Sequence, residues 1–149
     1  MPVKDVCVRS VVHVNRETTI HEAAQLMRQH HVGDLIVADP GEDGIKPVGI
    51  ITDRDVVLSV VAPKLDATVI TVGDIMGADL VTCREDMGVS ECIHKMRSRG
   101  VRRMPIVNLA GDLVGIVSVD DLIEILAEEL SELARLIARE QGREVRLRR

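Results

Sequence analysis

Two short segments combine the residue types that can hold a phosphorylated ribose. They read Gly49-Ile-Ile-Thr-Asp-Arg-Asp55 and Gly115-Ile-Val-Ser-Val-Asp-Asp121. In the first segment Thr52 is followed three residues later by Asp55, and in the second Ser118 and Asp121 take these places. A hydroxyl beside free N–H groups at a helix start favours phosphate, and a carboxylate accepts hydrogen bonds from sugar hydroxyls. The same spacing is also that of an ordinary helix cap, and each leading glycine leaves room for a ligand or another backbone segment.

The two segments belong to an internal repeat. An offset of 69 aligns residues 3–39 with residues 72–108, and after a loop that is three residues longer in the first copy an offset of 66 aligns 48–50 with 114–116. A unit of about 60 residues buries too little apolar surface to be comfortably stable alone. We therefore expect the two copies to share a core, related by pseudo-two-fold symmetry, with two similar clefts between them.

Each copy is predicted to run strand, helix, strand, strand, helix. Predicted strands cover residues 11–14, 35–38, 48–51, 80–83, 104–107 and 113–117, and helices start near residues 20, 53, 89 and 119. Apolar residues recurring at i, i+3, i+4 and i+7 indicate the helices. Thr19 with Glu22 predicts a capping box, and Gly33 and Gly100 are expected at the helix ends, where a positive φ is useful.

Composition restricts the kind of protein. The chain of 149 residues has no Phe, Tyr or Trp, so aliphatic side chains must grip any flat ligand. Its net charge of −5 makes nucleic acid an unlikely partner. No apolar run has the length needed to cross a bilayer, and the N-terminus has no signal-peptide pattern, so we expect a cytoplasmic protein without a membrane partner. Neither a disulfide framework nor a cysteine zinc site is expected from Cys7, Cys83 and Cys92, because they are odd in number and lack a C-x-x-C spacing.

These segments, in this order, resemble the CBS domain family, named from cystathionine β-synthase. The segments that carry the resemblance are the two Gly-x-x-Thr/Ser-x-x-Asp turns and residues 11–15, 48–55 and 101–107. The resemblance implies an α+β fold of tandem CBS domains, each β-α-β-β-α, followed by a long C-terminal helix. The expected divisions are CBS domain 1 at 1–62, a linker at 63–71, CBS domain 2 at 72–130, and a helical extension with a basic tail at 131–149.

The resemblance also implies a function. The chain would be a regulatory module rather than an enzyme, binding AMP, ADP or ATP, with S-adenosylmethionine or NAD as alternatives, and signalling to a separate, unidentified protein. The alternative is a structural or dimerisation scaffold with ligand-free clefts. By the resemblance, the carboxylates of the two turns hold ribose and the hydroxyls contact phosphate. The remaining expected ligand contacts are His13, Val14, Thr82 and Cys83 near the adenine, with Leu35, Met104 and Pro105 as the opposing wall.

The two copies differ in charge. Arg102 and Arg103 stand where the first copy has Gly33 and Asp34, and Arg54 stands where the second copy has an aspartate. Since the guanidinium fork suits phosphate, we hypothesise that these arginines decide which cleft takes phosphates. Solvated arginines or surface ion pairs are the alternative.

The last predicted helix carries an apolar stripe that runs past the second copy. Its members are Leu122, Leu126, Leu130, Leu133 and Ile137. The stripe either packs on its own module or forms a subunit contact. Because CBS pairs often form homodimers, the resemblance favours a homodimer.

Overall fold

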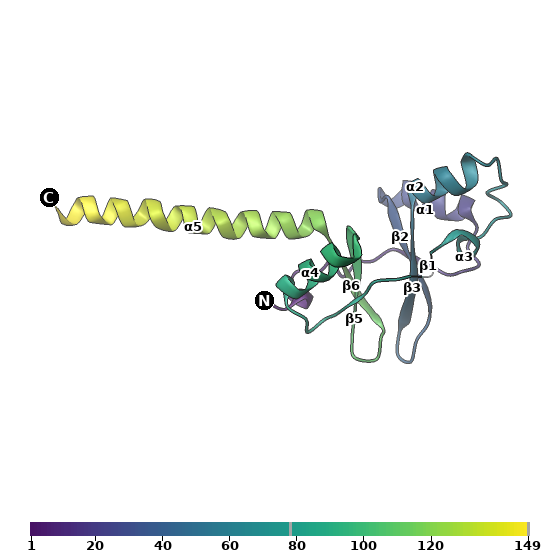
Figure 1. Ribbon diagram of the computed structural model, residues 1–149, viewed down its shortest axis with the longest axis horizontal. Helices are drawn as coiled ribbons and strands as arrows, with labels where there is room; N and C mark the ends of the chain where they lie inside the picture. The colour runs from purple at the N-terminus through teal and green to yellow at the C-terminus, as the bar shows by residue number, and fades with distance from the viewer. Residues whose placement is uncertain (78, 149) are drawn as a thin grey trace. The chain divides into compact units, whose positions relative to one another are not determined.

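The computed structural model describes residues 1–77 and 79–148 of the chain. The expected mixed architecture, with two repeats and a long final helix, is confirmed (Figure 1). The elements are η1 (Val3–Asp5), β1 (His13–Val14), α1 (Ile20–His30), β2 (Asp34–Pro40), β3 (Ile45–Thr52), α2 (Asp53–Val56), η2 (Val57–Val61), α3 (Val72–Ile75), β4 (Cys83–Arg84), α4 (Val89–Arg99), β5 (Arg103–Val107), β6 (Leu113–Ser118) and α5 (Val119–Leu147). The chain divides into two compact units, Met1–Val117 and Ser118–Arg149, and each is described by itself.

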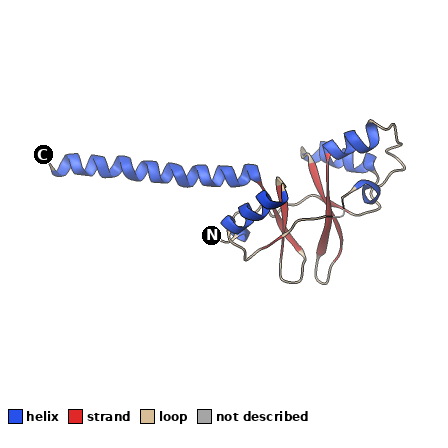
Figure 2. Cartoon of the chain, in the orientation of Figure 1, coloured by secondary structure: helices blue, strands red, loops and turns tan. Residues whose placement is uncertain are grey.

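Each copy of the repeat forms a three-stranded sheet, in the orders β1-β2-β3 and β4-β5-β6. In both sheets the short first strand lies parallel to the second, and β2 and β3 are antiparallel. Figure 2 shows β2 with β3, and β5 with β6, as two hairpins. The first strands are shorter than expected because only two residues of each form ladder pairs.

The N-terminal helix η1, which the sequence pattern did not predict, is bonded to the turn between β4 and α4 of the other copy, and the segment after it is bonded to β6. The N–H of Val3 donates to the carbonyl of Met87 at 2.8 Å, and Val8 pairs with Ile116 in an antiparallel bridge. Figure 1 shows this N-terminal segment beside α4. The first residues of the chain therefore stabilise the second sheet.

The equivalent helix of the second copy, α3, makes the reciprocal exchange. The N–H of Val72 donates to the carbonyl of Thr18 at 2.8 Å, and the fully buried Val72 joins the core around Ile20 and Leu35. Each copy thus binds a short helix that belongs, by sequence, to the other copy. This exchange explains how two units too small to be stable alone form one folded body.

The glycines of the two turns make room for these crossing segments. A Cβ on Gly115 would lie 2.7 Å from Cys7 Sγ and 2.9 Å from the carbonyl oxygen of Val8. A Cβ on Gly49 would lie 2.8 Å from Met76 Sδ. Cys7 and Met76 are equivalent under the offset of 69. The close neighbours of both glycines are therefore parts of the protein itself, just beyond η1 and α3.

The helix ends follow the sequence prediction in one copy and depart from it in the other. The capping box is confirmed, because Thr19 Oγ1 accepts from the N–H of Glu22 at 3.2 Å. Gly100 ends α4 with φ 67°, as expected. Gly33 is not the cap residue: α1 ends at His30, and its C-cap is His31, the equivalent of Gly100, with φ 55°. The cap lies two residues earlier than Gly33, and a histidine adopts the left-handed conformation there.

Replacing His31 by glycine is expected to stabilise the protein. A residue with a Cβ loses about 1 kcal/mol in the left-handed region, and glycine does not. His31→Gly should therefore raise the free energy of unfolding by roughly 0.5–1 kcal/mol, measured by urea denaturation. Gly100→Ala is the mirror control and should lower it. A destabilised His31→Gly variant would show that the imidazole makes a contact worth more than the backbone strain.

Two cysteines correct the sequence analysis. The structure joins Cys83 of β4 and Cys92 of α4 in a disulfide, with Cα atoms 6.6 Å apart, and Cys7 is a free thiol. Cys92 lies on the predicted buried helix face, and that face packs against the strand that holds Cys83. That Cys83 and Cys92 meet depends on how α4 packs against β4, and no spacing motif in the sequence predicts this packing.

The second unit consists mainly of α5, which begins at Val119, directly after the cap residue Ser118, and runs for 29 residues. Among the described residues, no helix combines the length and apolarity that a bilayer crossing needs.

Candidate functional site

The hydroxyl and carboxylate of the first turn are bonded to each other's backbone. Thr52 Oγ1 accepts from the N–H of Asp55 at 3.1 Å, and Asp55 Oδ2 accepts from the N–H of Thr52 at 2.9 Å. Both residues are half-buried. The pair forms a capping box at the start of α2.

The second turn repeats this geometry at the start of α5. Ser118 Oγ accepts from the N–H of Asp121 at 3.1 Å, and Asp121 Oδ2 accepts from the N–H of Ser118 at 3.3 Å. The helix-cap interpretation of both segments is therefore correct as far as the protein's own bonds go. A carboxylate keeps further lone pairs after one hydrogen bond, so capping leaves capacity to accept from a ligand.

A cavity of about 150 Å³ lies between the two sequence copies. Its lining residues are Gly49 and Ile50 of the first copy with Gly77, Asp79, Leu80, Val81, Val101 and Arg103 of the second. The lining is mostly aliphatic and includes two charged side chains, Asp79 and Arg103. The cavity lies where a cleft between the copies was expected and includes Arg103 of the predicted contacts, but Thr52 and Asp55 are not among its lining residues.

Arg103 is paired across the two copies with its own equivalent, Asp34. Arg103 Nε lies 2.8 Å from Asp34 Oδ2, yet among the described residues that oxygen has no partner with hydrogen-bond geometry. The contact is an ion pair without a directed hydrogen bond. Burial raises the pKa of the Asp34 carboxyl, Arg103 offsets this in part, and the like charge of Asp53 adds to it.

The raised pKa of Asp34 predicts a pH-dependent stability. The folded protein keeps this proton at pH values where the unfolded chain has lost it, so the contribution is present below the ordinary value of 3.8 and is lost as pH rises through the raised pKa. Asp34→Asn should therefore be more stable than wild type at pH 7 and should equal it near pH 3, by urea denaturation at both. A variant less stable at pH 7 would mean that the ion pair outweighs burial.

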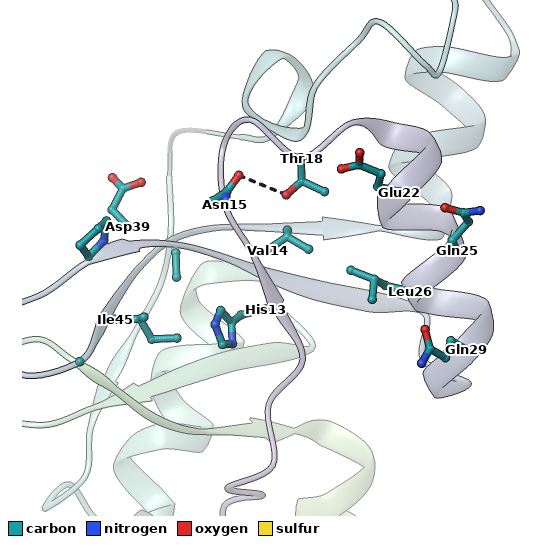
Figure 3. Close-up of a pocket in the computed structure, with 13 residues that line it drawn as sticks. His13, Val14, Asn15, Thr18, Glu22, Gln25, Leu26, Gln29, Asp39 and Ile45 are labelled. Carbon is teal, nitrogen blue, oxygen red and sulfur yellow. Dashed lines mark hydrogen bonds between the residues drawn. The ribbon is translucent and has the colours of Figure 1, made fainter.

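A larger cavity, of about 670 Å³, lies on the first copy (Figure 3). Its lining residues are His13, Val14, Asn15, Thr18, Glu22, Gln25, Leu26, Gln29, Ala38, Asp39, Pro40, Gly44 and Ile45. Figure 3 shows polar side chains of β1 and α1 around Val14 and Leu26, with Thr18 bonded to Asn15. Two of the predicted adenine contacts, His13 and Val14, are among these residues.

Thr52 and Asp55 of the first turn are not among the residues that line this larger cavity. The cavity includes Pro40 and Ile45, which pair with each other at the hairpin end of β2. Thr52 instead pairs with Asp34, at the opposite end of the same strand. His13 pairs with Ile36, only two residues along β2 from Asp34, so its backbone lies toward the same end of the sheet as Thr52.

The other predicted contacts have varied surroundings. The side chains of Leu35, Met104 and Pro105 are almost completely buried in the cores. Cys83 is held in the disulfide, and the carbonyl of Thr82 accepts from Lys95 Nζ at 2.6 Å. Arg54 and Arg102 are exposed. A ligand would thus meet these buried residues through backbone atoms rather than through their side chains.

The sequence analysis missed five of the residues that line the smaller cavity: Gly77, Asp79, Leu80, Val81 and Val101. Leu80 and Val81 belong to a predicted strand, whose β-branched pattern identifies it as structural. In the structure the ladder begins only at Cys83, so both residues lie in a connecting segment and face the cavity. The sequence would have revealed this only if it showed that β4 is so short, and an apolar run does not show where a strand begins or ends.

The comparisons with known proteins agree with this geometry. The family model described as CBS domain matches residues 3–62 and 72–128. The chain is similar to the CBS domain-containing protein YhcV of Bacillus subtilis, with 38% identity over 120 residues, which cover 80% of this chain and 81% of the relative. It is also 35% identical to an uncharacterized protein of Methanopyrus kandleri, over 83% of this chain and 61% of that protein. The chain thus matches less than two thirds of the Methanopyrus protein.

A solved structure is similar over nearly the same region. It is the CBS domain pair of protein MJ0100, in complex with 5′-methylthioadenosine and S-adenosyl-L-methionine. The TM-score is 0.72 and the identity 27%, over 87% of this chain and 98% of that chain.

Proposed function

This chain belongs to the CBS domain family, and from that premise we propose that it is a regulatory module that binds an adenosyl ligand between its two repeats and signals to a separate protein. The observation that carries the proposal is the aliphatic cavity between the copies, with Arg103 on its wall. A similar domain pair, that of MJ0100, is solved with two adenosyl compounds. AMP, ADP or ATP are the ligands that we propose here, because phosphate would compete with Asp34 for the guanidinium of Arg103.

Binding must open the cleft. Pockets for small molecules are typically about 300–1,000 Å³, whereas the cavity measures about 150 Å³. The ligand therefore binds an open arrangement in preference to the closed one, and this differential affinity shifts the population of the two. The shift of one copy against the other is the signal that we propose a partner protein detects.

The two turns and the neighbouring segments supply the remaining contacts in this proposal. Asp55 and Asp121 accept from ribose hydroxyls with the lone pairs that capping leaves free, and Thr52 and Ser118 meet phosphate beside the helix N–H groups. Adenine is held by aliphatic groups and by the backbone near Thr82. These contacts bind a ligand without changing it, and we propose no catalytic role.

A thermal-shift screen tests the proposal. A ligand that binds only the folded state raises the melting temperature, and the rise grows with the logarithm of the ligand concentration above its Kd. We expect at least one of AMP, ADP, ATP, S-adenosylmethionine and NAD to raise it, and Asp121→Ala to reduce that rise. No shift with any of the five would refute the sensor function and support the scaffold.

The ion pair between Arg103 and Asp34 leads to a prediction about phosphate recognition, which substitutions at both residues test. Arg103→Ala should weaken the affinity for AMP by roughly tenfold or more, the value of one charge-assisted hydrogen bond. It should leave the affinity for adenosine unchanged, and calorimetric titrations measure both. Asp34→Asn is the matched control: it frees the guanidinium from its ion pair, so AMP should bind more tightly. Equal losses for AMP and adenosine would contradict a phosphate contact.

The scaffold alternative is favoured by one observation, the capping boxes. Both turns already satisfy their hydroxyls and carboxylates with backbone bonds, so their presence does not require a ligand. A scaffold predicts that Asp55→Ala changes stability by about 1 kcal/mol and changes no ligand affinity.

We also propose a homodimer located in the cytoplasm. Because most cytoplasms keep thiols reduced, Cys83 and Cys92 would be free thiols there. Differential alkylation of acid-quenched cells measures their state directly. A fully oxidised pair would argue against a reducing compartment.

A further inference from the structure

The C-terminal helix α5 carries a regular apolar seam, formed by Ile123, Leu126, Leu130, Leu133 and Ile137. The intervals alternate between three and four residues, which is the spacing of core positions in a coiled coil. Each of the five side chains is between 49% and 68% exposed. A stripe of five large exposed residues on one helix is more than scattered surface apolarity explains.

The charges along α5 are divided by sequence position. Residues 120–132 contain six acidic and no basic residues, whereas residues 135–149 contain six arginines and two glutamates. The helix dipole favours acids at the start and bases at the end, but its effect fades within one turn. It does not account for Glu128 and Arg135, which lie near the middle. A partner helix with the opposite order of charges accounts for both residues.

We propose that α5 pairs with the α5 of a second copy of this chain in an antiparallel arrangement. In that arrangement Leu130 of one copy packs against Leu133 of the other, and Leu126 packs against Ile137. The acidic half of each helix then lies beside the basic half of the other, at an axis separation of about 8–10 Å, close to the Debye length at physiological salt. Ala127 and Ala134 flank the seam and allow close approach.

A parallel pair is disfavoured by the residues that continue the seam. Glu140 and Glu144 occupy the next two positions of the three–four pattern. In a parallel, in-register pair each glutamate would face its own copy across the contact, and such like charges repel. In the antiparallel pair Glu140 lies opposite Ile123 of the other copy and Glu144 opposite Val119, so neither glutamate faces its own equivalent. A membrane surface is also a poor occupant, because interfacial helices carry a basic polar face and half of this one is acidic.

The first test compares one added charge in two places on the full chain. Leu130→Glu lies in the seam, and Ser131→Glu, its neighbour, points away from it. We expect sedimentation velocity to show that Leu130→Glu halves the mass of the assembly and that Ser131→Glu leaves it unchanged. Unfolding curves check that both variants stay folded. An equal mass for the two variants would overturn the proposal.

Spin labels then test the orientation. In a Cys7→Ser background, a label at Ser131→Cys lies near the centre of the antiparallel pair, and one at Arg146→Cys lies near its end. At 1.5 Å per residue, antiparallel helices place the two end labels about 44 Å apart along the axis, whereas the central labels stay within roughly 20 Å. Short distances at both positions would indicate a parallel pair, and no dipolar coupling at either would indicate a helix that packs on its own chain. Either result overturns the proposal.

Discussion

A chain carrying Cys83→Ala and Cys92→Ala is expected to unfold with a free energy about 2.5 kcal/mol lower than the oxidised wild type. The two cysteines are 9 residues apart, and closing a loop of that length removes conformations from the unfolded chain. The disulfide also fixes β4 to α4, next to Leu80 and Val81 of the cavity between the copies. Urea denaturation without reductant measures the difference.

The control for the disulfide is the third cysteine. Cys7→Ala removes a free thiol, so its effect should stay within about 1 kcal/mol, the range of ordinary substitutions. The wild type in strong reductant should approach the double variant, and the double variant should not respond to reductant. If the double variant and Cys7→Ala had the same midpoint, the disulfide would contribute nothing to stability.

Gly115→Ala is expected to lower the free energy of unfolding by about 1–3 kcal/mol, the usual cost of overpacking. The new methyl group would press on Cys7 Sγ at 2.7 Å and on the carbonyl oxygen of Val8 at 2.9 Å. That carbonyl accepts from the N–H of Ile116 at 2.9 Å, so relief requires moving paired backbone. The change should therefore loosen the N-terminal segment from the second sheet, and hydrogen exchange at Val8 would report it.

Two other glycines provide matched controls for this prediction. Gly49→Ala meets only the flexible end of Met76, so its effect should be smaller than that of Gly115→Ala. Gly142→Ala, in α5, meets nothing within 4 Å and should stabilise the helix by about 1 kcal/mol, because alanine is the better helix former. Equal effects at residues 49 and 115 would show that the backbone contact of Val8 is not the cause.

The repeat made most of the fold predictable. Each prediction for one copy had an equivalent in the other, so a helix face such as the one starting at Ile20 was supported by the one starting at Val89. Local bonds followed as well: the capping box at Thr19 depends on residues three apart, which the sequence places together by itself. The helices η1 and α3 were missed because three or four residues are too few to show a period.

The candidate site was less predictable because it depends on contacts between distant residues. Thr52 and Asp55 are neighbours in the chain, and their mutual bonding follows from that alone. That Arg103 faces Asp34, and that Cys83 reaches Cys92, depends instead on how strands and helices pack, and no spacing in the chain encodes these distances.

The amino-acid sequence by itself determined the two copies, their order of strands and helices, the caps, and the apolar and charged stripes of α5, because each of these arises from residues within a few positions of one another. The tertiary structure alone decided that η1 and α3 each pack against the opposite copy, that Gly49 and Gly115 make room for the crossing segments, and that one arginine lines the cavity between the copies. Burial joins residues that the chain separates by tens of positions, and only the complete packing of both copies fixes which of them meet.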